Sequence, residues 1–177
     1  MDNGSRCTMT LDGTDCPIQE PGSTTGNFSP RWYCHKTHGP GIRYEVGVSL
    51  QCGDVVWVNG PFPCGSYPDL KIARLMVVHK LLPNEKIVAD SGYRDRSYFD
   101  IPTGLNNPKQ RMQQVARSRH ETVNARFKKF KLLSTPYRGD INKHYYFFTA
   151  IAVIIQVSIN NGNKLFQINY DDTVYEE

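Results

Sequence analysis

Residues 7–18, the stretch that places the first strand, read CTMTLDGTDCPI. Side chains alternate in polarity from Cys7 to Leu11, and a period of two residues is typical of a β-strand. The run ends at Asp12, and residues 12–15 have the composition of a turn. We therefore expect a short strand that carries a carboxylate at its end.

A second carboxylate ends a more apolar run, and a third lies in a helix. Residues 86–89 read KIVA and lead into Asp90, while Glu121 falls in a helix-like segment over 110–133. Carboxylates on two strand ends and one helix can converge on Mg²⁺ or Mn²⁺, which take oxygen ligands. Two such ions can stabilise the attacking and leaving oxygens of a phosphodiester. The spacing alone is weakly specific, because the chain has 17 acidic residues and such aspartates commonly form turns or caps.

The hydrophobic pattern predicts the other elements. Strands are expected over 44–51 and 55–59, joined as a hairpin by a turn at 52–54, and over 84–89. Helices are expected over 69–82, 110–133 and 140–160, and Asp140 is the expected N-cap of the last helix. The apolar face expected for the helix over 110–133 consists of Val115, Val123, Phe127, Phe130 and Leu133. This order predicts an α/β fold, a mixed sheet with flanking helices.

If Asp12 and Asp90 both serve one site, the first strand and the strand over 84–89 must lie side by side. The length of 177 residues and the hydrophobic content of 39% are those of one globular domain. We expect this domain over 1–160 and an acidic, loosely ordered tail over 161–177. The formal net charge of +4 is compatible with a polyanionic partner without demonstrating one.

The five cysteines are widely spaced and form no Cys-x-x-Cys motif, so we do not expect a zinc site. The first residues lack the apolar run of a signal peptide, and we therefore expect a reducing, intracellular compartment with free thiols. The longest apolar run covers 145–159 and contains Gln156. It is shorter than the roughly 20 residues that span a bilayer, so it predicts a buried core helix and no membrane partner.

Several segments resemble motifs of the DDE transposases of the PIF/Harbinger type. They occur in the family's order and extend from residue 7 to about residue 157. The segments are Leu11–Ile18, Trp32-Tyr33 with Lys36, Gly39–Val46, Val56–Pro61 with Pro68–Leu70, Ala89–Tyr93 and Arg117–Leu133. An ordered series of motifs is far more specific than any single one.

The resemblance implies an RNase H-like fold and a nuclease that cleaves and transfers DNA strands with Mg²⁺ or Mn²⁺. It assigns Asp12, Asp90 and Glu121 as the metal ligands and the catalytic residues. Asp15 is expected to support the site at most. For Asp69, the simpler interpretation is a cap for the helix that follows.

Basic and polar residues around Glu121 are candidates for contact with the DNA backbone. Arg117 and Asn124 lie four residues before and three residues after Glu121, so they share its face of the helix. Arg126, Lys128 and Lys129 make the same helix basic, which suits a phosphate backbone. The alternative is the solvated outer face of an ordinary helix.

Transposases of this type carry a helical region before the first catalytic strand, so the resemblance predicts an N-terminally truncated chain. A separate Myb-like DNA-binding protein is then an expected partner, and the nucleus the expected location in a eukaryote. Two other hypotheses remain open. One is a domesticated or decayed transposase domain that binds DNA or protein without cleavage, and the other is an unrelated α/β domain with structural acids.

Overall fold

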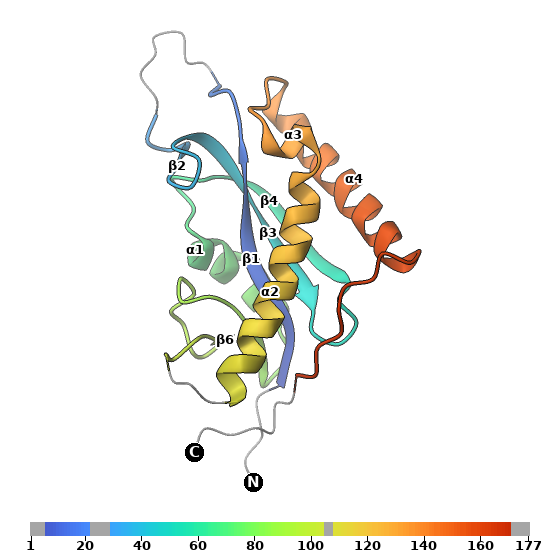
Figure 1. The fold of residues 1–177 in the computed structure, drawn as a ribbon. Helices are drawn as coiled ribbons and strands as arrows, with labels where there is room; N and C mark the ends of the chain where they lie inside the picture. Colours follow the sequence, from blue (N-terminus) through green and yellow to red (C-terminus); the bar gives the residue numbers. More distant parts are fainter. Residues whose placement is uncertain (1–5, 22–28, 105–107, 171–177) are drawn as a thin grey trace.

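The fold is a six-stranded mixed sheet with helices on both faces (Figure 1). The computed structural model describes residues 6–21, 29–104 and 108–170. The strands are β1 (Arg6–Pro17), β2 (Tyr33–Cys34), β3 (Gly39–Ser49), β4 (Val55–Pro63), β5 (Glu85–Val88) and β6 (Phe99–Asp100). Their order is β2-β3-β1-β5-β6, and β4 also pairs with β3. This confirms the expected α/β class with an RNase H-like mixed sheet.

The strand β1 has different neighbours along its two edges. It pairs parallel with β5, with Thr10 opposite Val88, which confirms that the two carboxylate-bearing strands are adjacent. It pairs antiparallel with β3 from Met9 to Pro17, with Asp12 opposite Val46. Because β5 ends at Val88, one edge of β1 loses its neighbour close to Asp12. In α/β folds, ligands bind in the crevice beyond the strand ends, at the point where the order of the strands reverses.

The expectation of a turn at residues 12–15 was wrong. The strand β1 continues to Pro17 because β3 supplies a hydrogen-bonding partner along the whole length, as far as Gly41. Sequence composition records the turn propensity of Gly13 and its neighbours, whereas the long-range pairing overrides it. The expected hairpin is confirmed as β3 and β4, and its turn includes Gly53 at φ +79°.

The helices form two cores, one on each face of the sheet (Figure 1). They are α1 (Asp69–Leu75), the 3-10 helix η1 (Val77–Lys80), α2 (Pro108–Lys128), α3 (Lys131–Ser134) and α4 (Ile141–Asn160). On one face, α2 and α4 pack on β3 through stacked rings, with Phe148 between Tyr44 and Phe127. On the other face, α1 packs against β1 and β5 through Ala73, Leu11 and Ile87.

Two helices are shorter than their patterns predict. The helical pattern over 69–82 is split into α1 and η1, and the pattern over 110–133 is split at Phe130 between α2 and α3. The side of α2 that faces the sheet includes Gln113, Ala116 and His120. Val115 is 45% exposed, so its assignment to the apolar face was wrong.

The helix α4 agrees with its predicted limits, and Asp140 accepts a hydrogen bond from the Asn142 amide at 3.0 Å as its N-cap. The expectation that α4 is buried holds for one side only. Phe148 and Ile155 are buried, whereas Tyr146 and Val153 are exposed. Among the described residues, no helix is both long and apolar enough to cross a membrane.

Residues 161–170 follow α4 without regular structure. Leu165 is nevertheless buried in the core with α4, and the Tyr170 hydroxyl donates a hydrogen bond to Asp100 at 3.1 Å. The acidic residues of the expected tail, Asp171, Asp172, Glu176 and Glu177, lie outside the described residues.

Candidate active site

The carboxylate of Asp12 accepts one hydrogen bond from its own strand, β1, and one from the helix α2. Its Oδ1 accepts from the Gly13 amide at 2.8 Å, and its Oδ2 accepts from Asn124 Nδ2 of α2 at 2.9 Å. The other end of the Asn124 amide accepts from the Thr14 hydroxyl at 2.5 Å. The amide therefore has a defined orientation, and each Asp12 oxygen keeps a lone pair free for another ligand.

Asp90 lies two residues beyond the end of β5, in a tight turn. Its Oδ1 accepts from the Gly92 amide at 2.8 Å, and its carbonyl accepts from the Tyr93 amide at 3.2 Å. These contacts hold the side chain at the edge that β5 leaves open next to Asp12. Glu121 approaches from α2, where its side chain is exposed.

All three predicted carboxylates line one pocket of about 140 Å³. The rest of the lining consists of Thr10, Leu11, Lys36, Arg117 and His120. Residues far apart in the chain thus meet where β1, the end of β5 and α2 converge. This convergence counts against an unrelated domain whose acids serve only turns and caps.

Burial makes the ionised form of Asp12 unfavourable in the free protein. Burial raises the pKa of Asp12 from 3.8 to about 6, and the carboxylates of Asp69 and Asp90 act in the same direction. Lys36 and the Gly13 amide oppose this rise. A carboxylate that is costly to ionise in the free protein gains most from a bound cation.

Lys36 reaches the pocket from the turn between β2 and β3. The sequence did not indicate a role for Lys36. The strand pairing that brings Lys36 close to Asp12 cannot be recognised from the residues next to it in the chain. Two cationic side chains, Lys36 and Arg117, therefore flank the three carboxylates. Such groups are suited to the oxygens of a phosphate.

His120 is a buried contact between α2 and β1. Its Nδ1 lies 2.8 Å from the Thr10 hydroxyl, and burial lowers its pKa to about 3. The ring is therefore neutral over the physiological range. The hydrogen bond fixes the position of α2 one residue before Glu121.

The residues expected to contact DNA have separate positions. Arg117 lines the pocket, and Lys129 is exposed in the turn that follows α2. Asn124 instead orients Asp12, as described above. The other two candidates bind carbonyl groups of the protein itself. Arg126 donates to Asn163 at 2.7 Å, and Lys128 donates to Asp15 and, at 3.2 Å, to Leu133.

Asp15 of β1 and Asp69 of α1 lie on the face of β1 that is opposite the carboxylate pocket. Arg43 donates to both Asp15 oxygens, at 2.5 and 2.8 Å, and its Nε lies 3.3 Å from Asp69. Burial opposes the ionisation of Asp15, but Arg43 holds the pKa below its usual range. Asp15 does not line the carboxylate pocket.

The capping role expected for Asp69 was wrong. Pro68 occupies the N-cap position of α1, and no side chain makes a capping hydrogen bond there. The Asp69 carboxylate turns instead towards Arg43 and packs over Gly13, where a Cβ atom would lie 2.0 Å from its Oδ1. Glycine at position 13 therefore lets a half-buried carboxylate approach the strand beside Asp12.

The chain matches the model of a protein family. No curated protein and no solved structure matches the chain. The model of one family, described as DDE superfamily endonuclease, matches residues 11–156. This span contains Asp12, Asp90 and Glu121.

Proposed function

We propose that this chain, which belongs to the DDE superfamily endonucleases, is the catalytic domain of a metal-dependent DNA endonuclease or transposase. In this proposal Asp12, Asp90 and Glu121 are the catalytic residues and hold Mg²⁺ or Mn²⁺. The observation that carries it is the convergence of the three carboxylates in one pocket.

The donor set fits such ions. Three carboxylates from separate elements offer oxygen ligands alone, which Mg²⁺ and Mn²⁺ prefer. Burial raises the pKa of Asp12 to about 6, so a bound cation would favour its ionised form. When bound, the ions would activate the nucleophile and stabilise the charge on a phosphodiester oxygen.

The protein's own groups have complementary tasks in this scheme. Asn124 and the Gly13 amide orient Asp12, and the Gly92 amide orients Asp90. Lys36 and Arg117 would bind the oxygens of the phosphate from the rim of the pocket. The nucleophile would be water for hydrolysis or a DNA 3′ hydroxyl for strand transfer.

DNA is the substrate that this site suits best. Arg117 lies on the same helix as Glu121, and the exposed Lys129 follows the last residue of that helix, so the backbone could run along α2 past the pocket. A Myb-like protein that selects the site is a compatible partner, and the nucleus is the proposed location in a eukaryotic cell. The alternative of a binding domain without cleavage is less favoured, because all three carboxylates are retained in one pocket.

Nicking of supercoiled plasmid with Mn²⁺ tests the proposal. The wild type should nick, whereas Asp90→Ala and Glu121→Gln should lose activity without loss of folding. Asp140→Asn is the matched control, since it changes an acid outside the pocket and asparagine also caps helices well. Equal nicking by the wild type and Asp90→Ala would refute the proposed site.

A further inference from the structure

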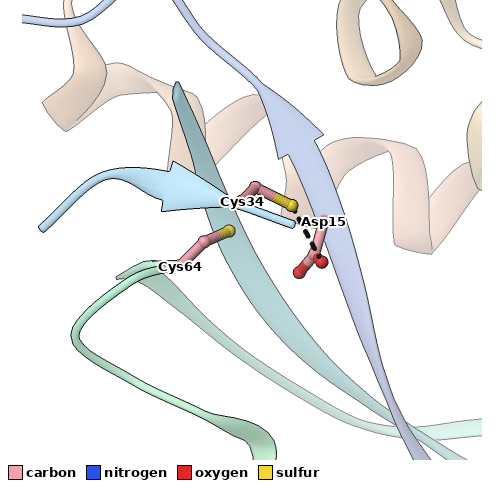
Figure 2. Close-up of side chains that lie close together, drawn as sticks. All are labelled: Asp15, Cys34 and Cys64. Atoms are coloured by element: carbon pink, nitrogen blue, oxygen red, sulfur yellow. Dashed lines mark hydrogen bonds between the residues drawn. The ribbon is translucent and has the colours of Figure 1, made fainter. Parts of the chain in front are cut away.

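A second cluster of ligand atoms lies on the face of β1 opposite the carboxylate pocket. It consists of Asp15 from β1, Cys34 from β2 and Cys64, which follows β4. Figure 2 shows the two sulfur atoms and the carboxylate turned towards one another. One ligand atom of each lies within 4.8 Å of the others, and all three residues are buried. Cys34 and Cys64 are not joined by a disulfide bond.

We propose that Asp15, Cys34 and Cys64 form a metal site for a thiophilic divalent cation of the zinc class. This site is separate from the catalytic carboxylates and goes beyond the proposed function. Two thiolates and one carboxylate favour zinc over magnesium or manganese. Three protein ligands leave a fourth tetrahedral position for water.

The spacing is close to that of a zinc site before any ion binds. With the usual bond lengths, a tetrahedral ion separates a sulfur from an oxygen ligand by about 3.6 Å and two sulfur ligands by about 3.8 Å. Cys34 Sγ lies 3.3 Å from Asp15 Oδ2. Given the limit of 4.8 Å for the whole cluster, binding needs movements of no more than about 1 Å, which side-chain rotation can supply.

Gly41 of β3 makes this approach of the two thiols possible. A Cβ atom at position 41 would lie 3.0 Å from the Cys34 Cβ and 3.2 Å from the Cys64 sulfur. Both contacts are tighter than ordinary packing allows. The missing side chain therefore leaves the space in which Cys34 and Cys64 meet.

Arg43 supplies the compensating charge. Two thiolates, a carboxylate and a divalent cation have a net charge of −1, which the guanidinium beside Asp15 offsets. Its two hydrogen bonds to Asp15 occupy two of about four lone-pair directions of the carboxylate, so one oxygen can still bind the ion. Partners of this kind orient metal ligands in many proteins.

Binding of the cation is balanced by proton release. Each thiol that becomes a ligand gives up one proton to solvent, and no oxidant or reductant is needed. Burial raises the pKa of the Cys64 thiol above its usual range, so the free protein keeps this proton. Sequence spacing did not indicate the site, because Cys34 and Cys64 meet only through the pairing of β2, β3 and β4.

Titration of the reduced full chain with Co²⁺ tests the proposal, because thiolate coordination gives a charge-transfer absorption that carboxylate coordination does not. We expect one equivalent of Co²⁺ with this absorption, displaced by Zn²⁺. Cys34→Ser and Cys64→Ser should each lose it. Cys52→Ser is the matched control, since Cys52 is exposed and outside the cluster, and it should keep the signal.

The catalytic pocket is distinguished by Asp90→Ala, which should keep the absorption while losing Mn²⁺-dependent nicking. Circular dichroism of each cysteine variant checks that loss of the signal is not loss of folding. If Cys34→Ser does not fold, Cys64→Ala supplies the decisive comparison. The proposal is overturned if the folded, reduced wild type shows no thiolate-to-cobalt absorption, or if folded Cys34→Ser and Cys64→Ser keep it.

Discussion

Asn124 of α2 donates a hydrogen bond of 2.9 Å to Asp12 of β1, and its amide oxygen accepts one of 2.5 Å from Thr14. The Asn124 side chain thus forms hydrogen bonds with two residues on the same face of β1. These bonds set the distance between α2 and β1. Because Glu121 lies three residues earlier on the same helix, this contact also positions Glu121 relative to Asp12.

Asn124→Ala should lower Mn²⁺-dependent nicking by about 10- to 100-fold, the usual effect of removing a partner of a metal ligand. The physical reason is the freed rotation of the Asp12 carboxylate. The Mn²⁺ concentration for half-maximal activity should rise, a change that a purely structural role would not cause. Thr122→Ala is the control, because Thr122 is exposed and bonds only to the Ser118 carbonyl of its own helix. An unchanged Mn²⁺ dependence would contradict the positioning role.

Ionisation of Asp12 should cost the metal-free protein stability as the pH rises from about 4 to about 6. The pKa of Asp12 is about 6 in the folded protein against 3.8 in the unfolded chain, so the folded state binds more protons in this interval and is favoured at its acidic end. Above pH 6 the loss is complete. After allowance for relaxation of the half-buried site, it amounts to roughly 1–2 kcal/mol.

Asp12→Asn should remove this part of the pH dependence. Burial also raises the pKa of Glu45, to about 7, with the same sign, so the difference between the two proteins isolates Asp12. Urea unfolding in EDTA at pH 4.5 and 7.5 measures it. The Asn124 amide can turn over to accept from the substituted side chain, which limits the loss of hydrogen bonds. Parallel pH profiles for the two proteins would be inconsistent with a raised pKa at Asp12.

Lys36→Gln should reduce nicking by about 10- to 100-fold, because a cation that stabilises the phosphate is lost. It should also move the acidic limb of the pH–activity profile to higher pH, since Lys36 lowers the pKa of Asp12. Lys36→Arg should restore much of both. Lys143→Gln, an exposed lysine of α4, is the control for the change in net charge. A profile with unchanged limbs would show that Lys36 does not act on Asp12.

Gly13→Ala should destabilise the fold by about 1–3 kcal/mol, the usual cost of forcing extra atoms into a packed site. The added Cβ atom would lie 2.0 Å from Asp69 Oδ1. In an Asp69→Ala background, the same change should cost markedly less, because the colliding oxygen is gone. Thermal or urea unfolding of the four proteins gives the coupling. Strict additivity would mean that Gly13 and Asp69 do not compete for this space.

Local sequence patterns were sufficient to predict much of the architecture. The hairpin of β3 and β4 depends on alternation and a tight turn, and the start of α4 depends on a cap at Asp140, so both can be recognised within a short segment. The three carboxylates of the pocket were also identifiable, from chemistry and from the order of the surrounding motifs. Their expected roles remain predictions that the proposed variants test.

By itself, the sequence determined the class of the fold, the family and the acids that meet in the pocket. The tertiary structure alone decided that β1 continues past Asp12, that Asn124 holds Asp12, and that Lys128 bonds within the protein. It also decided that Asp15, Cys34 and Cys64 come together. The physical reason is range: periodicity, turns and caps depend on neighbours a few residues apart, whereas these contacts depend on strand pairing and helix packing between distant segments.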